Sequence, residues 1–102
     1  MIKPVSVTPE SEAQVRAIDA WWRAERPMAP DMFLNELAEA FEMIRHFAGA
    51  GQRVPHGNIA GVRRVLLRAS RFHVYYVERA EVVDVLAVWS AVRGRGPHLG
   101  AL

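Results

Sequence analysis

Four arginines, a histidine and two tyrosines fall within the 15 residues from Arg63 to Val77, RRVLLRASRFHVYYV. Each guanidinium is planar and permanently charged, and its forked donors match the oxygens of a carboxylate or a phosphate. Apolar residues on both sides of a short AS connection are typical of a β-hairpin. These cations therefore form either an ordinary solvated sheet face or a face that binds an anionic partner.

The basic residues are unevenly distributed along the chain. Residues 1–50 carry five basic and eight acidic side chains, whereas residues 51–102 carry eight basic and three acidic ones. Twelve of the 13 basic residues are arginine, a bias that fits specific contacts to anions and equally fits a GC-rich genome. The asymmetry makes the second half of the chain the candidate for contact with an anionic partner.

Length and composition exclude several classes of protein. The 102 residues predict a single domain, 1–102, with a flexible Gly-rich tail from about residue 94. The absence of cysteine excludes disulfides, thiol catalysis and cysteine-ligated zinc, and the four histidines are widely separated, so we expect no metal site and no cofactor. No apolar run approaches about 18 residues and no signal peptide is apparent, so we expect a cytoplasmic protein without membrane contact.

The first half of the chain has the pattern of two helices. Residues 3–7 favour a short edge strand, after which Thr8 and Pro9 are suited to cap and begin a helix that ends before Arg26. A second helix begins at residues 30–31 and has the clearest helical period in the chain. Its apolar face consists of Phe33, Leu37, Phe41 and Ile44.

The second half predicts three strands, 62–68, 72–77 and 82–89, joined by short connections. Such runs form an antiparallel meander. The two helices have too little surface to be stable alone, so they need this sheet to cover their apolar sides. The predicted fold is an α+β domain of order β-α-α-β-β-β, with the helical hairpin packed on one face of a small antiparallel sheet.

The register of the first strand pair decides which residues share a face. An AS turn of two residues, or one of equal parity, pairs Arg68 with Arg71. The same register sets Arg64 opposite Tyr75, whereas a three-residue turn would bring arginines into the core, where an unpaired charge is costly. The apolar face then carries Val65, Leu67, Phe72, Val74 and Tyr76. The opposite face carries Arg64, Leu66, Arg68, Arg71, His73 and Tyr75.

Pairing Glu78 with Glu81 extends both faces to the third strand. Val83, Val85, Ala87 and Trp89 then join the apolar face, and Val82, Asp84, Leu86 and Val88 join the arginine face. A plain solvated face seldom exposes so much apolar area, and a mixture of Arg, Tyr and aliphatic residues is typical of a recognition surface. The alternative is that the first strand, or the loop before the sheet, covers this face.

The chain resembles a known family in these same segments. The element order, the stretch GNIAGVRRVLL, the strand pair FHVYYVERAEVVDVLAVW and the basic tail resemble the RelE/ParE superfamily of toxins from bacterial type II toxin–antitoxin systems. The resemblance covers nearly the whole chain and is most specific from Gly61 to Arg95. It implies a small basic toxin held inactive in a hetero-oligomer with a cognate antitoxin, ParD-like or another small DNA-binding protein.

RelE-type members of this superfamily cleave mRNA in the ribosome without a metal, using cations and basic or tyrosine side chains. Their cations correspond here to Arg64, to Leu66, and to Arg93 or Arg95 after the last strand. Leu66 cannot contribute a charge, His73 replaces an arginine, and the carboxy-terminal helix that bears a tyrosine is missing. Arg64, His73 and Arg93 are therefore the catalytic candidates only if the chain is a RelE-like ribonuclease.

ParE-type members inhibit DNA gyrase and lack that catalytic set, and HVYYV resembles their form of this strand. The resemblance favours a ParE-like inhibitor that is not an enzyme, acts on a target such as DNA gyrase, and is neutralised by an antitoxin whose acidic residues meet the arginines. The alternatives are a RelE-like ribonuclease acting on mRNA in the ribosome, and an inactive relic that retains only antitoxin binding. The expected contact residues are Arg64, Leu66, Arg68, Arg71, His73, Tyr75, Asp84, Leu86, Arg93 and Arg95.

Overall fold

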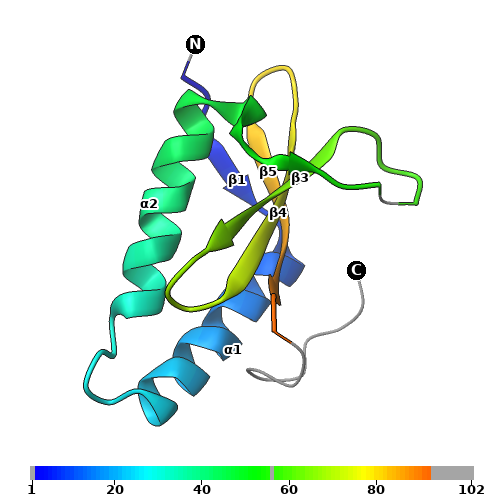
Figure 1. The fold of residues 1–102 in the computed structure, drawn as a ribbon. Coiled ribbons are helices and arrows are strands. Elements are labelled where there is room, and N and C mark those ends of the chain that lie inside the picture. The colour runs from blue at the N-terminus through cyan, green and yellow to red at the C-terminus, as the bar shows by residue number, and fades with distance from the viewer. Residues whose placement is uncertain (1, 56, 93–102) are drawn as a thin grey trace.

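The computed structural model describes residues 2–55 and 57–92, and two helices lie on one side of its sheet (Figure 1). The α+β class and the placement of the helical hairpin agree with the sequence-based prediction. The tail from about residue 94, predicted to be flexible, lies outside the described residues. The elements are β1 (Val5–Val7), α1 (Pro9–Glu25), α2 (Met32–His46), the 3-10 helix η1 (Ala48–Ala50), β2 (Gln52–Arg53), β3 (Val62–Leu67), β4 (Phe72–Glu78) and β5 (Val83–Ser90).

The sheet has five strands in the order β1-β5-β4-β3-β2. Strands β3, β4 and β5 form the predicted antiparallel meander. The prediction of a wholly antiparallel sheet is wrong at one edge, because β1 pairs with β5 in parallel, with Val5 opposite Val83. The sequence does not predict β2 at the other edge, since its two residues carry no apolar alternation.

Helix α1 begins as predicted and is anchored to β5. Thr8 caps it, with Oγ1 accepting a hydrogen bond from the backbone N–H of Ser11 at 3.1 Å. The buried Ser11 hydroxyl donates to the carbonyl oxygen of Val85 at 3.0 Å, and Gln14 Oε1 accepts from the N–H of Val88 at 2.9 Å. Side chains of α1 therefore satisfy backbone groups of β5 at and beyond the end of short β1.

The core lies between the two helices and the inner face of the sheet. The rings of Phe33 and Phe72 meet edge to face with centroids 5.4 Å apart, which links α2 to β4. The indole N–H of Trp22 donates to the carbonyl oxygen of Ala29 at 2.9 Å and holds the connection between the helices. The buried residues of this core are Ile18, Trp22, Phe33, Leu37, Ala40, Ile44, Val65, Leu67, Phe72, Val74, Tyr76, Val83, Val85 and Val88.

The register predicted for β3 and β4 is confirmed for every pair from Arg63 to Leu67. The predicted pair of Arg68 and Arg71 is not formed, because residues 68–71 make a four-residue turn. Arg71 completes this turn with a φ of 67°, in the left-handed region. A turn of four residues has the same parity as one of two, so the apolar and cationic residues still separate onto opposite faces.

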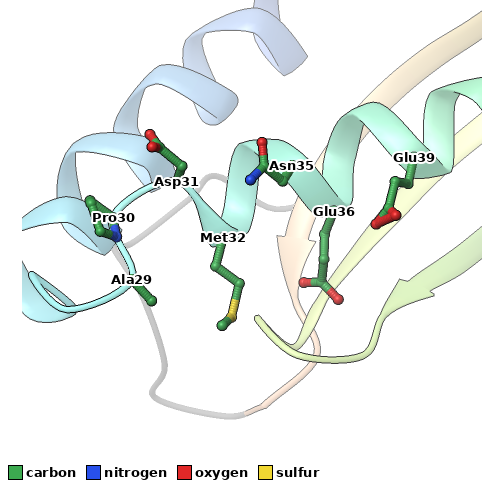
Figure 2. Close-up of a pocket in the computed structure, with 7 residues that line it drawn as sticks. All are labelled: Ala29, Pro30, Asp31, Met32, Asn35, Glu36 and Glu39. Atoms are coloured by element: carbon green, nitrogen blue, oxygen red, sulfur yellow. The ribbon is translucent and has the colours of Figure 1, made fainter.

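Helix α2 holds this turn in place. The two carboxylate oxygens of Glu36 accept hydrogen bonds from the N–H groups of Ala69 and Ser70, at 2.7 and 2.8 Å. Figure 2 shows Glu36 extending from α2 toward the turn. A charged acceptor makes stronger hydrogen bonds than a neutral one, so Glu36 fixes the tip of the hairpin against the helix.

The register predicted for β5 is wrong. Val85, rather than Val83, lies opposite Tyr76, and Val83 pairs with Glu78. The cause is the connection, since residues 79–82 separate the two strands where the prediction required two residues. The strand is thus displaced by two residues, which leaves Val83 and Val85 on the predicted inner face.

A β-bulge at Leu86 then reverses the rest of β5. Ala87 lies opposite Tyr75 on the outer face, although it was expected inside. Val88, expected outside, is fully buried in the core. Trp89, also expected inside, is partly buried and packs against residues of both faces. One inserted residue is enough to exchange the faces, because side chains alternate along a strand.

Tyr76 is buried, and its hydroxyl holds the segment between η1 and β2. The hydroxyl donates to the carbonyl oxygen of Ala48 at 2.7 Å and accepts from the N–H of Gly51 at 2.9 Å. A Cβ atom on Gly51 would lie 2.5 Å from the Tyr76 oxygen and 2.9 Å from the carbonyl oxygen of Arg64, so the site requires glycine. Burial raises the pKa of Tyr76, which keeps the hydroxyl a donor.

Replacing Glu36 with alanine leaves the N–H groups of Ala69 and Ser70 without their acceptor. We expect the free energy of unfolding, measured by urea denaturation, to fall by about 1–3 kcal/mol. Glu39→Ala is the matched control, because Glu39 lines the same side of α2 but does not bond to the turn; a change within about 0.5 kcal/mol is expected there. Equal losses in the two variants would contradict the role given to Glu36.

Tyr76→Phe removes both hydrogen bonds of the buried hydroxyl while it preserves the ring. The Gly51 N–H and the Ala48 carbonyl lose a partner, so we expect the free energy of unfolding to fall by about 1–3 kcal/mol. Tyr75→Phe is the control, since the Tyr75 hydroxyl makes one long contact, 3.4 Å from Arg64 Nη1. The stabilising role of the Tyr76 hydroxyl is ruled out if both variants unfold at the same urea concentration.

Candidate functional site

The outer face of the sheet, opposite the helices, has a covered part and an open part. Tyr75 lies on this face as predicted but is only 7% exposed, so it supports the surface from below. The loop between β2 and β3 covers this part, which is the alternative that the sequence left open. The covered cluster consists of Val62, Tyr75 and Ala87, with Val54, Ile59, Leu86 and Trp89 packed against it.

The open part contains a cleft of about 370 Å³ at the edge of β3, which we call the Arg64 cleft. One wall carries the side chains expected from the sequence, from β3, the hairpin turn and β4. The other wall comes from the second half of α2 and from the residues around the start of β2. The lining residues are Met43, Ala50, Gly51, Gln52, Arg64, Val65, Leu66, Arg68 and His73.

Arg64 is oriented by polar neighbours. Its Nη1 lies 3.4 Å from the hydroxyl oxygen of Tyr75, and its Nε lies 3.4 Å from Gln52 Oε1. The His73 ring meets the Tyr75 ring edge to face, with centroids 5.9 Å apart. The buried Tyr75 ring therefore supports both Arg64 and His73 from the covered part of the face.

The cations of this face lack acidic partners. Within the part of the chain that the structure describes, no carboxylate forms an ion pair with Arg64, Arg68 or Arg71. Most of the other arginine and lysine side chains in this part of the chain do pair with a carboxylate, including Lys3 and, on α1, Arg16 and Arg23. Positive charge without a counter-charge in a cleft attracts an anionic group.

His73 is the titratable residue of the cleft. Partial burial lowers the pKa of His73 below its usual value, and the positive charges of Arg64 and Arg71 lower it further. The imidazole is therefore neutral near pH 7 and can accept a hydrogen bond or a proton. An anion bound beside it would instead favour the charged form.

The structure does not bring all the expected contact residues to the cleft. Asp84 lies toward the other end of β5 and pairs with Arg79, with 3.5 Å between Nε and Oδ2. Leu86 packs against the covered cluster. Arg93 and Arg95 lie outside the described residues. The cleft itself unites Arg64, Leu66, Arg68 and His73.

Sequence reasoning missed the second wall of the cleft. Met43 is 40% exposed and lies off the apolar face of α2, and an exposed apolar residue on a helix was the available signal. Gly51 belongs to a glycine-rich stretch that the sequence marks only as the end of a helix. Its role depends on the distant Tyr76 hydroxyl, which no local pattern reveals.

A second hollow, of about 450 Å³, lies beside the first half of α2. Figure 2 shows its lining, which includes Asp31, Met32, Glu36 and Glu39. Asp31 already pairs with Arg23 at 2.7 Å, and Glu36 holds the hairpin turn. Two of the three carboxylates therefore have structural roles, and this acidic hollow differs in charge from the Arg64 cleft.

Comparison with known proteins identifies the family. The family described as the ParE toxin of the type II toxin–antitoxin system parDE matches residues 5–94 of the chain. The chain belongs to the ParE toxin family. All the residues that line the Arg64 cleft and all the described strands lie within the matched region.

Two solved structures share the fold of this chain. The chromosomal ParDE TA system from P. aeruginosa aligns with a TM-score of 0.72 at 16% identity, covering 89% of this chain and 98% of that chain. The E. coli DinJ–YafQ toxin–antitoxin complex aligns with a TM-score of 0.58 at 8% identity, covering 88% of this chain and 93% of that chain. At these identities the likeness shows a shared fold. No curated protein sequence matches the chain.

Within residues 2–55 and 57–92, no helix is both long enough and apolar enough to cross a membrane. Nor do three or more His, Cys, Asp or Glu side chains in this part of the chain gather as ligands for a metal ion.

The lowered pKa of His73 gives a pH dependence with a definite sign. As the pH falls, the unfolded chain binds the proton first. The contribution of His73 to the free energy of unfolding is therefore fully present above the unfolded pKa of about 6.5, and it declines as the pH falls toward the lower folded pKa. We expect NMR titration to place the His73 pKa below that of a model peptide. Arg64→Gln should raise it by removing a positive charge, whereas Arg16→Gln on α1 should not. An unchanged His73 pKa in Arg64→Gln would refute the electrostatic account.

Proposed function

We propose that this ParE-family protein inhibits growth by binding an essential cytoplasmic target such as DNA gyrase, and that a cognate antitoxin neutralises it. Family membership supports the role of toxin. The observation that carries the proposal is the Arg64 cleft, which is lined by Arg64, Arg68 and His73. Among the described residues, no carboxylate lines this cleft or forms an ion pair with either arginine. A protein partner with acidic side chains supplies the missing counter-charge.

The composition of the cleft favours binding over cleavage. Leu66 stands where the resemblance places a cation of the ribonuclease branch, and it is 39% exposed at the cleft. A leucine there adds apolar contact to a partner but cannot stabilise charge on a phosphate in a transition state. Tyr75 is buried beneath Arg64, so its ring is a support for the surface.

A ribosome-dependent ribonuclease of the RelE kind is the second candidate. Arg64 and His73, two of its three candidate catalytic residues, line the same cleft. The lowered pKa leaves the His73 imidazole free to accept a proton near neutral pH, as a general base must. Arg93, the third candidate, lies outside the described residues. An inactive relic that retains only antitoxin binding is the remaining alternative.

Controlled expression of the protein alone in a bacterial host tests the toxin role. We expect growth to stop, and to resume when the small protein encoded beside the toxin gene is co-expressed. The purified protein is then assayed for inhibition of supercoiling by gyrase and for mRNA cleavage in ribosomes. Inhibition of supercoiling supports the proposal, while cleavage alone overturns it in favour of the ribonuclease. Normal growth on expression overturns both and leaves the relic.

A further inference from the structure

Helix α2 presents a stripe of side chains on the side that faces the hairpin turn, and we call this stripe the α2 flank. It consists of Met32, Glu36, Glu39 and Met43, which recur at intervals of three and four residues and therefore lie on one side of the helix. Figure 2 shows the first three extending from this side. Met32 and Met43 are 37% and 40% exposed, and Glu39 is exposed as well.

The two ends of the α2 flank lie beside groups of opposite charge. The hollow at the first half of the helix is lined by Glu36 and Glu39. The Arg64 cleft at the second half is lined by Arg68. Glu36 brings Arg68 close to the helix, because its carboxylate accepts a hydrogen bond from the N–H of the next residue, Ala69, at 2.7 Å.

These opposite charges do not meet within one molecule. In the described part of the chain, Glu39 forms no ion pair with a basic side chain, and Arg68 forms none with a carboxylate. Each end of the flank thus combines an exposed methionine with a charge that has no counter-charge. A surface with the same features in the reverse order would satisfy both ends at once.

A second copy of the chain provides this surface when the two α2 helices pack antiparallel. A two-fold axis perpendicular to the helix, midway between Met32 and Met43, places each of these methionines opposite the other one of the second copy. Like residues stay apart, because the two positions are about 16 Å from each other along one helix. The same axis sets Glu39 against the turn that Glu36 holds in the second copy, where Arg68 lies. Every contact occurs twice in such an interface.

We infer that the free protein forms a reversible two-fold dimer through the α2 flank, with Met32 against Met43 and Glu39 against Arg68 of the second copy. This dimer goes beyond the proposed function, because the partner is neither the target nor an antitoxin. It covers Met43 and Arg68, which line the Arg64 cleft. A molecule that binds the cleft must therefore take the monomer and shifts the equilibrium away from the dimer.

A partner of a single charge fits the α2 flank less well than a second copy does. A basic protein would pair with Glu39 but would bring a like charge toward Arg68. An acidic protein would pair with Arg68 and repel Glu39. Only a partner with charges of both signs in the reverse order matches the whole flank, and a second copy of the chain is such a partner.

Sedimentation velocity of the purified full-length protein, free of any antitoxin, tests for the dimer. A small interface gives a weak complex, so samples from about 5 to about 500 µM are compared. We expect the sedimentation coefficient to rise from that of a monomer to that of a dimer over this range. A monomer at every concentration overturns the inference. Urea denaturation of Glu39→Ala at a few micromolar reports on the monomer alone.

Charge reversal tests the pairing of Glu39 with Arg68. Glu39→Arg and Arg68→Glu each place like charges against each other across the two-fold axis, so each variant should dimerise at least about tenfold more weakly. In an equimolar mixture of the two variants, each arginine again meets a glutamate, and dimerisation should return to within about threefold of the parent. Glu81→Arg is the control, because Glu81 is exposed in the connection between β4 and β5 and lines neither hollow; it should dimerise as the parent does.

Disulfide trapping tests the antiparallel register. The chain has no cysteine, so Met32→Cys and Met43→Cys each introduce a single thiol. Under mild oxidation, the mixture of these two variants should form a covalent dimer at least about fivefold faster than either variant alone, because only the mixture brings two thiols within disulfide distance. A mixture of Met43→Cys with Glu81→Cys gives the rate of random collision.

Three further results overturn the inference. They are a dimer that both charge-reversed variants retain, a mixture of those variants that stays monomeric, and trapping no faster than random collision. NMR spectra verify that every variant is folded, so that loss of the dimer is not confused with unfolding. Growth arrest is scored separately in cells, so a protein that stops growth but remains monomeric keeps the proposed function and loses this inference.

Discussion

Two hydrogen bonds of the Tyr76 hydroxyl determine where the sheet ends and where the cleft begins. They tie the Ala48 carbonyl and the Gly51 N–H to the inner side of β4. Because the chain is held there, β2 has only two residues and the edge of β3 stays open at Leu66. The same contact leaves no room for a side chain at Gly51. A buried hydroxyl on the inner face thus shapes the outer site.

The neighbouring tyrosine supports the other side of the same site. Tyr75 points to the outer face, where Ala87 lies opposite it because Leu86 forms a bulge. The small alanine and the loop residues packed there enclose the ring, while its hydroxyl faces Arg64 at 3.4 Å. Adjacent residues of β4 therefore serve opposite faces: Tyr76 holds the segment before β2 and so leaves the β3 edge open, and Tyr75 supports Arg64 on the outer face.

The parts of the fold that the sequence predicts correctly are those where any other arrangement would bury a charged side chain. The β3–β4 register is determined in advance, because any register of odd parity would bury Arg64 or its neighbours. The register of β5 is not, since VVDVLAVW is almost uniformly apolar and satisfies the core in more than one register. The bulge at Leu86 and the longer connection at 79–82 therefore leave no sequence signal.

The candidate site, too, is predictable from the sequence only in part. Its cationic wall lies on one strand pair and can be read from alternation, whereas Met43 and Gly51 reach it through tertiary contacts. Glu36 is a further example: its spacing on α2 suggests a solvated position, yet its carboxylate holds the hairpin turn. Contacts between residues more than 30 positions apart have no local signature, so the sequence predicts the charge of the cleft but not its shape.

The cleft places positive groups close together at an electrostatic cost to the free protein. Arg64 and Arg71 both disfavour a charge on His73, and partial burial disfavours it more. The free protein relieves this repulsion by leaving the imidazole neutral, but the guanidinium groups cannot lose their charge. A fold under no other demand would place a carboxylate nearby, as α1 does for Arg16 and Arg23. The absence of one among the described residues around Arg64 fits a surface whose counter-charge belongs to another molecule.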